Sequence, residues 1–157
     1  METKLRKLQE SDLKTFFNFQ QNEEANFMAA FISRDPKNWD EFINHWNKIL
    51  SDDLNYIRTI TYKNIVVGNM LSFLMFEQRE IGYWIDKDYW GKGIATEALK
   101  LFLFEIKERP LFAHVAFDNI GSIKVLEKCG FTKIGEDKYF AKAREKEITE
   151  FIFKIEN

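Results

Sequence analysis

Among its 157 residues the sequence has one cysteine, two prolines and two histidines. The single Cys129 cannot form a disulfide within the chain, and so few cysteines and histidines leave too few ligands for a structural zinc site. No segment approaches the roughly 20 apolar residues of a membrane-spanning helix. The first residues, METKLRKLQESDLK, also lack the apolar core of a signal peptide. We therefore expect a cytoplasmic protein with neither a disulfide nor a metal site, and no membrane partner.

An excess of positive charge is also missing. The 23 basic and 25 acidic residues give a net charge of -2, so no overall positive field would attract nucleic acid. Hydrophobic residues make up 45% of the chain and aromatic residues 16%, including 16 Phe. This composition excludes a disordered chain and predicts an aromatic-rich core. The length is typical of one domain, so we expect residues 1–157 to form a single domain.

The first third of the chain is mainly helical in pattern. The alternation from Thr3 to Leu8 predicts a strand. Ser11 offers an N-cap for a helix with hydrophobic residues at Leu13, Phe16 and Phe17. Asp35-Pro36 predicts the start of a second helix, whose hydrophobic stripe runs from Trp39 to Leu50.

The middle of the chain is extended in pattern. Strands are predicted from Tyr56 to Tyr62 and from Ile65 to Phe76, joined by a turn at Lys63-Asn64. The charged segment Glu77 to Arg79 predicts the next turn, and Ile81 to Ile85 the next strand.

Glycine and proline divide the last third of the chain. A helix is predicted directly after the loop from Trp90 to Ala95, and we expect Pro110 to stop it. A short helix from Ser122 to Lys128 is expected to end at Gly130. The remaining strands are expected at Leu111 to Phe117, Phe131 to Ile134 and Glu150 to Ile155.

The segment with the clearest chemical meaning is IGYWIDKDYWGKGIATEALK, residues 81–100. A strand ends there in a loop with two glycines, which remove side-chain bulk where the backbone must approach a ligand. The first N–H groups of the following helix are unpaired and carry the positive end of its dipole, so the backbone can hold a pyrophosphate. The alternative is an ordinary strand-to-helix turn. The expected contacts come from Gly91, Lys92, Gly93, Ile94, Ala95 and Thr96.

Two well-known phosphate loops do not match this segment. A Walker loop needs Gly-Lys-Ser/Thr, whereas Ile94 follows Gly93 here. A Rossmann fingerprint needs a third glycine within an early βαβ unit, whereas this loop follows several predicted hairpin strands. The topology therefore favours another class of nucleotide-binding protein.

The loop from Trp90 to Ala95 resembles the Gln/Arg-x-x-Gly-x-Gly/Ala pyrophosphate motif of the GNAT superfamily of N-acetyltransferases. Downstream, Asn119-Ile-Gly-Ser122 and the helix ending in Gly130-Phe131 resemble the segment that follows the fifth strand of that superfamily. Together with Glu80 to Ile85, these motifs are most similar to the branch that acetylates the N-terminal alanine or serine of ribosomal proteins. The resemblance covers Ile65 to Ile155, and the first 64 residues match in pattern only.

The resemblance implies an α/β fold of the GNAT type, with a mixed, mostly antiparallel central sheet flanked by helices. It also implies an enzyme that transfers an acetyl group directly from acetyl-CoA to an amine. The backbone of Tyr83, Trp84 and Ile85 would pair with the pantetheine arm as an added strand, and a backbone N–H there would stabilise the oxyanion. The side-chain amide of Asn119 would meet the pantetheine region, and the alternative for this residue is a turn asparagine.

Three residues depart from the superfamily pattern or suggest other chemistry. Trp90 stands where Gln or Arg is common, although an aromatic residue is usual in the ribosomal-protein branch. Leu126 stands where many members carry the tyrosine that protonates the leaving thiolate, so that role does not carry over to this position. Cys129 suggests a thiol nucleophile, but a small buried thiol is the ordinary interpretation of its place in an apolar helix end.

The proton-transfer groups are left open by the sequence. An amine attacks only when it is neutral, so a nearby base should help. Glu80, at a place where related enzymes have a base carboxylate, is one candidate, and a solvated turn residue is its alternative. His114 is the other candidate base, with a structural strand histidine as its alternative. Ser122 resembles a serine proposed as proton donor in this branch, with helix capping as its alternative.

The acceptor is the least determined part. The branch favours a protein N-terminal amine, whereas relatives of the same fold use small amines such as antibiotics or polyamines. The aromatic-rich segments Phe27 to Phe31 and Trp39 to Trp46 are candidates for lining an acceptor cleft, or belong to the core. A non-catalytic acyl-CoA-binding module is the rival from another class. Exposed aromatic residues are also compatible with a homodimer contact.

Overall fold

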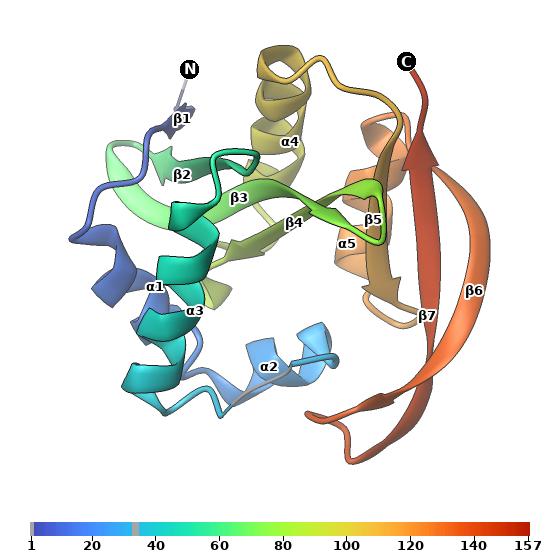
Figure 1. Cartoon of the computed structure of the whole chain (residues 1–157), viewed down its shortest axis with the longest axis horizontal. Coiled ribbons are helices and arrows are strands. Elements are labelled where there is room, and N and C mark those ends of the chain that lie inside the picture. Colours follow the sequence, from blue (N-terminus) through green and yellow to red (C-terminus); the bar gives the residue numbers. More distant parts are fainter. Residues whose placement is uncertain (1, 33–34) are drawn as a thin grey trace.

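The computed structural model describes residues 2–32 and 35–157, and in this part of the chain helices flank one sheet of seven strands (Figure 1). The strand order is β1-β2-β3-β4-β5-β7-β6, and neighbours are antiparallel except for the parallel pair β4 and β5. The strands are β1 (Thr3–Arg6), β2 (Tyr56–Tyr62), β3 (Ile65–Met75), β4 (Gln78–Ile85), β5 (Leu111–Ala116), β6 (Thr132–Ala141) and β7 (Lys146–Ile155). The helices are α1 (Asp12–Phe19), α2 (Glu23–Ala29), α3 (Trp39–Ser51), α4 (Ile94–Glu105) and α5 (Ile120–Lys128), with a 3-10 turn η1 (Lys87–Tyr89). This is the mixed, mostly antiparallel α/β architecture that the sequence predicts.

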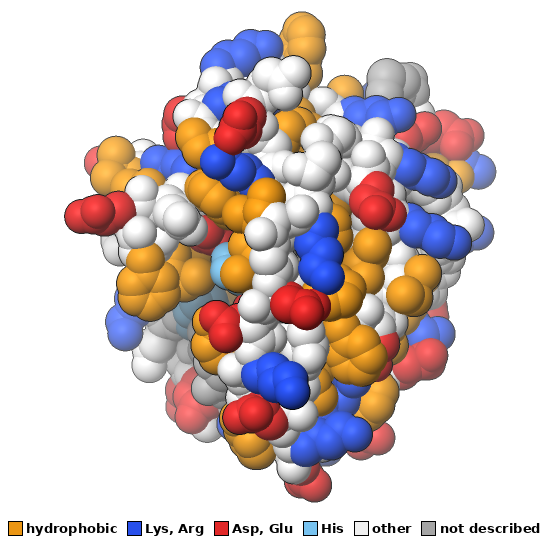
Figure 2. Space-filling view, turned by 90° about the vertical axis from the view of Figure 1, so that its right-hand side faces the viewer, with side chains coloured by type: hydrophobic (Ala, Val, Ile, Leu, Met, Phe, Trp, Pro, Cys, Tyr) orange, Lys and Arg blue, Asp and Glu red, His pale blue; other side chains and the backbone are white. Residues whose placement is uncertain are grey.

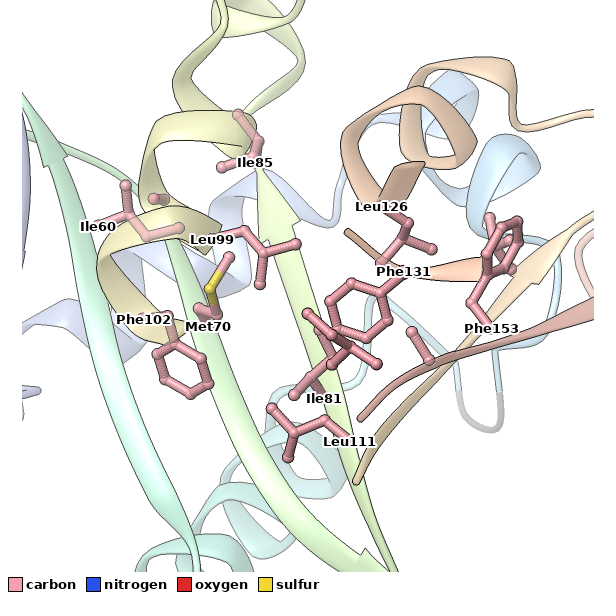
Figure 3. Packing of buried hydrophobic residues seen from close by; sticks show 14 of the residues in the cluster. Ile60, Met70, Ile81, Ile85, Leu99, Phe102, Leu111, Leu126, Phe131 and Phe153 are labelled. Atoms are coloured by element: carbon pink, nitrogen blue, oxygen red, sulfur yellow. The ribbon is translucent and has the colours of Figure 1, made fainter. Parts of the chain in front are cut away.

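One face of the sheet is covered by α4 and α5. Phe102 and Leu99 of α4 are completely buried against the strands, and burial of each such side chain contributes about 1.5–3 kcal/mol. Apolar residues occupy much of the α4 circumference because this helix is enclosed by the sheet and α5. The main residues of this core are Ile60, Met70, Ile81, Ile85, Leu99, Phe102, Leu111, Leu126, Phe131 and Phe153 (Figure 3).

The opposite face is covered by α1, α3 and α2. The helices α1 and α3 pack together through Phe16 and Trp46, whose ring centroids lie 5.6 Å apart. The helix α2 lies beside β5 on this face, because Ala30 packs against Ala116, whereas Ala113 and Val115 belong to the core under α4 and α5. The sheet therefore separates α2 from α5.

The helix α2 is missing from the sequence prediction. The Asn22 side chain accepts a hydrogen bond from the N–H of Ala25 at 2.8 Å, and Glu23 and Glu24 occupy the first turn, where the helix dipole favours negative charge. The helix has only seven residues, which is too short for a clear hydrophobic period. Its signal was the Asn22 cap followed by two acidic residues.

The two hairpin turns at the ends of β3 use left-handed backbone. Lys63 and Asn64, with φ of 51° and 68°, join β2 to β3 as predicted. The next turn is formed by Phe76 and Glu77, with φ of 52° and 64°, so the prediction of a turn over Glu77 to Arg79 is wrong. Consecutive left-handed residues match the twist of paired strands; Asn64 adopts this conformation readily, whereas pairing of the strands imposes it on Lys63, Phe76 and Glu77.

Two predicted helix limits are also wrong. The helix α3 begins at Trp39, because the Asn38 side chain accepts from the N–H of Glu41 at 3.1 Å. The Asp35 side chain instead accepts from the N–H of Lys37, in a turn that precedes the helix. The helix α4 ends at Glu105, well before Pro110. Its C-cap residue, Ile106, is already extended and turns its side chain into the core.

The carboxyl-terminal strands are longer than predicted. The sequence predicts strands only at Phe131 to Ile134 and Glu150 to Ile155, whereas β6 and β7 have ten residues each and pair as a hairpin. Most of β6 is exposed, so its residues do not alternate between polar and apolar types, and the periodicity that marks a strand is lost.

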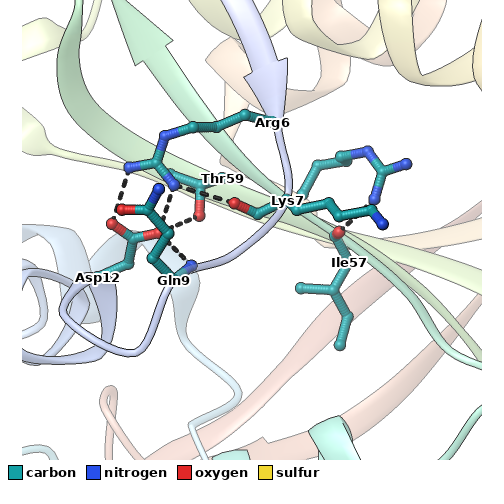
Figure 4. Close-up of polar contacts among 7 residues, drawn as sticks. Arg6, Lys7, Gln9, Asp12, Ile57 and Thr59 are labelled. Carbon is teal, nitrogen blue, oxygen red and sulfur yellow. Dashed lines mark hydrogen bonds and ion pairs between the residues drawn. The ribbon is translucent and has the colours of Figure 1, made fainter.

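A buried ion pair ties the start of the chain to the sheet (Figure 4). Asp12 is 3% exposed and accepts two hydrogen bonds from Arg6, at 2.8 and 2.9 Å. It also accepts from the hydroxyl of Thr59 and from the backbone N–H of Gln9. These donors hold the pKa of Asp12 below its usual value although burial opposes them. Ser11 precedes α1 but makes no side-chain cap, since Asp12 takes over this anchoring role.

The surface matches the balanced composition. On the face shown in Figure 2, basic and acidic side chains are interspersed with hydrophobic ones, and no large area of one charge is seen. Among the described residues, no helix is both long and apolar enough to cross a bilayer.

Candidate active site

The strands β4 and β5 diverge after a single contact. Within the described chain their parallel pairing is confined to Glu80 and Phe112. A cavity of about 820 Å³ fills the space between them. It is lined by residues 81–85 of β4, residues 113–116 of β5, the loop before α4, the start of α5, and α2. Because α2 and α5 lie on opposite faces of the sheet, the cavity passes through the sheet.

The glycine loop lies on the α4 and α5 side of this cavity. Gly91 and Gly93 both have φ of +78°, a left-handed conformation that glycine adopts without strain. A Cβ built on either glycine would meet no described atom within 4 Å, so the space in front of the loop is open. Gly93 is the N-cap of α4, whose first N–H groups have no helical partner. This geometry fits a diphosphate held by main-chain donors.

Five of the six predicted loop residues line the cavity, namely Gly91, Gly93, Ile94, Ala95 and Thr96. Lys92 is exposed and lies outside the lining. Two lysines that the sequence did not single out, Lys124 and Lys128 of α5, do line the cavity and add positive charge on this side. No glycine motif marks such residues, so they could not be predicted from the sequence.

The side chain of Trp90 connects the loop to β4. Its indole Nε1 donates to the carbonyl oxygen of Ile85 at 2.9 Å, and the ammonium of Lys87 lies 5.5 Å from the centre of its ring. Lys87 in turn pairs with Glu24 of α2 at 3.3 Å. Trp90 stands at the position where Gln or Arg is common in the superfamily that the sequence resembles. Its indole contacts β4 and Lys87, so it has a structural role here and leaves the loop backbone unobstructed.

The edge of β4 facing β5 is the predicted pantetheine edge. Beyond Glu80 it has no paired strand among the described residues, and Tyr83, Trp84 and Ile85 all line the cavity. The N–H of Asp86 donates to the carbonyl of Val67 on β3, so the alternate residue Trp84 also directs its backbone at β3, while Tyr83 and Ile85 face the open edge. The carbonyl of Ile85 already accepts from Trp90, which leaves Tyr83 as the freer backbone position. The indole N–H of Trp84 is buried and has no hydrogen-bond partner in the structure. An unpaired buried donor costs about 1–3 kcal/mol, and a ligand acceptor at this site would satisfy it.

One histidine contacts two carboxylates, and the three residues come from three different strands. The Nε2 atom of His114 on β5 lies 2.9 Å from Oε1 of Glu80 on β4, and its Nδ1 atom lies 3.0 Å from Oε1 of Glu150 on β7. The side chains of Glu80 and Glu150 are 3% and 14% exposed. The interpretation of Glu80 as a solvated turn residue is therefore wrong. His114 and Glu150 line the cavity, whereas Glu80 lies behind the imidazole.

These contacts decide the charge of His114. Hydrogen bonds to Glu150 and to Glu80 raise its pKa to about 10, although desolvation opposes them. At neutral pH both ring nitrogens then carry protons that are donated to carboxylate oxygens. A protonated imidazole has no lone pair to accept a proton, so the geometry favours a carboxylate over His114 as the base. Glu150 could not be predicted as a site residue from the sequence, because only the fold places it next to His114.

The two predicted residues at the start of α5 have different partners. The backbone N–H of Ser122 donates to Oδ1 of Asn119 at 3.3 Å. Asn119 is thus the cap of α5, and the capping interpretation of Ser122 is wrong. The hydroxyl of Tyr83 donates to Oγ of Ser122 at 3.0 Å. Burial raises the pKa of Tyr83 to about 12, so its hydroxyl stays protonated at neutral pH.

The helix α2 covers the cavity on the face opposite α4 and α5. Met28, Ala29 and Phe31 contribute apolar lining and Glu24 a carboxylate. The segment Phe27 to Phe31 thus lies partly at the predicted cleft, while Phe42 and Trp46 of the second aromatic segment belong to the core.

Two residues of the α5 helix end are packed and inert. Leu126 is 2% exposed within the main core. Burial raises the pKa of the Cys129 thiol, and its Sγ lies 3.6 Å from the carbonyl oxygen of Thr96. A raised pKa lowers the thiolate fraction, so the environment of Cys129 does not suit a nucleophile.

Comparison with known sequences gives one family. The family model described as an acetyltransferase (GNAT) domain matches residues 3–132. The probable N-acetyltransferase YjcK of Bacillus subtilis is 36% identical over 95 residues, which cover 58% of this chain and 49% of that protein. The spermidine N(1)-acetyltransferase of Vibrio cholerae is 24% identical over 154 residues, which cover 92% of this chain and 88% of that protein. The chain thus spans about half the length of YjcK, and most of the length of the second relative.

Solved structures show the same fold. The microcin C7 self-immunity acetyltransferase MccE, in complex with acetyl-CoA and AMP, superposes with a TM-score of 0.80 at 19% identity, covering 99% of this chain and 93% of the other. The ribosomal-protein-S5-alanine acetyltransferase of Vibrio fischeri superposes with a TM-score of 0.77 at 21% identity, covering 100% and 94%. At this level of identity the likeness concerns the fold.

Proposed function

Since the chain belongs to the GNAT acetyltransferase family, we propose that it is an enzyme that transfers an acetyl group from acetyl-CoA directly to an amine. The observation that carries the proposal is the cavity between β4 and β5, which joins the glycine loop on one face to a histidine–carboxylate cluster on the other. We take residues 1–157 as one catalytic domain and keep the expected cytoplasmic location as part of the proposal.

Acetyl-CoA would occupy the α4 and α5 side of the cavity. The main chain from Gly91 to Thr96 would hold its diphosphate, supported by the charge of Lys128. The free edge of β4 at Tyr83 would pair with the pantetheine arm, and Asn119 would close the other side. When bound, acetyl-CoA supplies the thioester whose carbonyl carbon the amine attacks.

The amine would enter on the α2 side. Glu80 and Glu150 carry two negative charges against one on His114, so the cluster attracts an ammonium group. The carboxylate of Glu150, which lines the cavity, would be in a position to receive the proton that the ammonium loses, with or without an intervening water. Glu80 and His114 would hold Glu150 in place, and Ser122 would face the leaving sulfur from the other side.

For the acceptor we propose a protein N-terminal amine, with ribosomal proteins as the first candidates. A small amine such as an antibiotic or a polyamine is the second candidate, since proteins of this fold and family act on both kinds of molecule. The apolar lining from Met28 and Phe31 supports an acceptor with a hydrophobic or compact group next to the amine.

The test is a screen of acceptors with acetyl-CoA. Peptides beginning with Ala, Ser or Met, spermidine and aminoglycosides are each incubated with the protein, and release of the CoA thiol and the mass of the acceptor are followed. We expect acetylated peptide N-termini. Acetylation of spermidine alone would favour the small-amine alternative. Tight acetyl-CoA binding without turnover on any acceptor would instead identify a non-catalytic acyl-CoA-binding module.

A homodimer remains part of the proposal. Exposed hydrophobic side chains on the edge strand β6 are the place where we would expect such a contact, and they are Ile134, Tyr139 and Phe140. Sedimentation of the wild type and of a Phe140→Ser variant tests it, with a monomeric wild type as the contrary result.

A further inference from the structure

The tyrosine that many relatives place on α5 is a leucine here. Leu126 is 2% exposed, packs in the core, and has no proton to offer a leaving sulfur. A different tyrosine lies at the same end of the cavity. Tyr83, from β4, donates its hydroxyl proton to Oγ of Ser122 on α5 at 3.0 Å. Both residues line the cavity, and among the described residues neither hydroxyl makes another hydrogen bond.

Both members of this pair are held in place. The ring of Tyr83 packs against the main core. The backbone N–H of Ser122 is held by Oδ1 of Asn119 at 3.3 Å. The pair therefore connects β4 to α5 within the lining of the cavity.

Donation from Tyr83 leaves the serine proton available to another acceptor. A serine hydroxyl has one proton and two lone pairs, and a free one rotates among several partners. Because Ser122 Oγ accepts the proton of Tyr83, its own O–H is turned away from Tyr83. Asn119 Oδ1 is already engaged by the Ser122 N–H, and Ser122 lines the cavity, so an acceptor placed in the cavity can receive the serine proton.

We propose that Tyr83 is a positioning residue whose hydroxyl orients Ser122, so that the serine O–H donates a hydrogen bond to the sulfur of the acyl donor. This inference rests on the proposed function. During transfer the C–N bond forms, the C–S bond breaks, and the electron pair of the broken bond stays on sulfur. The proton that the nitrogen releases reaches the thiolate through solvent. Tyr83 and Ser122 keep their own protons and stabilise the charge that develops on sulfur.

The acidities agree with a hydrogen bond rather than a full proton transfer. Burial raises the pKa of Tyr83 to about 12. An ordinary thiol has a pKa of about 8.5, so a thiolate is too weak a base to remove the proton of either hydroxyl. The contribution of the pair is thus electrostatic and depends on orientation.

A double-mutant cycle tests the coupling. We expect Tyr83→Phe to lower kcat about tenfold and Ser122→Ala about a hundredfold, with the KM for acetyl-CoA nearly unchanged. The double variant should be no slower than Ser122→Ala, because Tyr83 acts only through Ser122. Tyr139→Phe is the matched control, since that hydroxyl is exposed and contacts Asp137 outside the cavity. A tenfold loss that persists in the Ser122→Ala background would overturn the proposal.

A second measurement needs no turnover. The ultraviolet absorbance of the thiolate reports the titration of CoA bound to the protein. We expect the thiol of bound CoA to ionise at lower pH in the wild type and in Tyr139→Phe than in Tyr83→Phe. Equal midpoints in all three proteins would overturn the positioning role. If the wild type acetylates nothing but shows the shift, the proposed function fails while the arrangement of Tyr83 and Ser122 stands.

Discussion

The Nε2 atom of His114 lies 2.9 Å from Oε1 of Glu80, and this contact together with the one to Glu150 makes the histidine a cation in the folded protein. The pKa of His114 is raised from its ordinary value of 6.5 to about 10, with the hydrogen bond to Glu150 as the largest cause. The folded state thus binds one proton more than the unfolded state between these two values. The stabilisation is complete below about pH 6.5 and is lost as the pH rises toward 10.

We therefore expect the free energy of unfolding to fall between pH 7 and pH 9.5. Because the ring is partly exposed, solvent screening limits the effect to roughly 1–2 kcal/mol. Urea unfolding at several pH values measures it. In His114→Gln the same window should show a much flatter profile, and an equally steep decline in that variant would assign the effect to other groups.

Replacement of Glu150 by glutamine should separate acceptor binding from cofactor binding. We expect kcat/KM for the amine to fall about 10- to 100-fold, the loss typical of a hydrogen bond to a charged group, while the KM for acetyl-CoA stays the same. The pKa of His114, followed by NMR, should fall toward its ordinary value, because its largest perturbing contact is gone. Glu147→Gln, at an exposed position of the same strand, should change neither quantity.

Alanine at Gly93 should affect ligand binding more than folding. A side chain at φ of +78° costs about 1–2 kcal/mol of folding free energy, but a Cβ there meets no described atom within 4 Å. The same Cβ would stand where the diphosphate must approach, so we expect acetyl-CoA affinity to fall at least tenfold. Calorimetric titration and thermal unfolding measure the two effects. The control is Gly135→Ala on β6, where a Cβ also meets no described atom within 4 Å and φ is not left-handed. Unchanged acetyl-CoA affinity in Gly93→Ala would show that the loop is not part of the binding site.

Replacement of Arg144 should weaken the attachment of α2, the helix that covers one side of the cavity. The Arg144 side chain is 3% exposed, donates to both oxygens of Asp118 at 2.9 Å, and also donates to the carbonyl of Phe27 on α2. We expect Arg144→Met to destabilise the protein by about 3 kcal/mol and to raise the KM for the amine. Lys63→Met breaks an exposed ion pair with Glu2 and should cost less than 1 kcal/mol. A variant with lower stability but an unchanged KM would show that α2 does not shape the amine site.

The family, the α/β architecture and the glycine loop could be predicted because each has a local signal. The GNAT family and fold are confirmed, and the hairpin of β2 and β3 lies where hydrophobic pattern and turn residues predict it. The helices α4 and α5 exist as predicted, but α4 ends before Pro110 and α5 begins at Ile120 rather than at Ser122. The backbone geometry of Gly91 and Gly93 is what two glycines at a strand-to-helix junction indicate. The roles of the loop and of the proton-transfer groups stay predictions until acetyl-CoA is bound and the variants are measured.

The remaining features depend on contacts between distant segments. Glu150 meets His114 only because β7 lies beside β5, and Tyr83 meets Ser122 only because α5 crosses the end of β4. The sequence also offers no period for α2, which is short and capped by Asn22. Such pairs have no fixed spacing along the chain, so local patterns cannot reveal them.

The separation of β4 from β5 has a consequence for the order of events. Because the cavity is lined by α5 and the start of α4 on one side and by α2 on the other, the proposed arrangement would bring each co-substrate in from a different face of the sheet. Neither would then block the other's path, so both reactants could be bound at once and either one could bind first. The acetylated product can also depart while CoA is still in place, and a long polypeptide acceptor needs to insert only its terminus, with its remaining length outside in solvent.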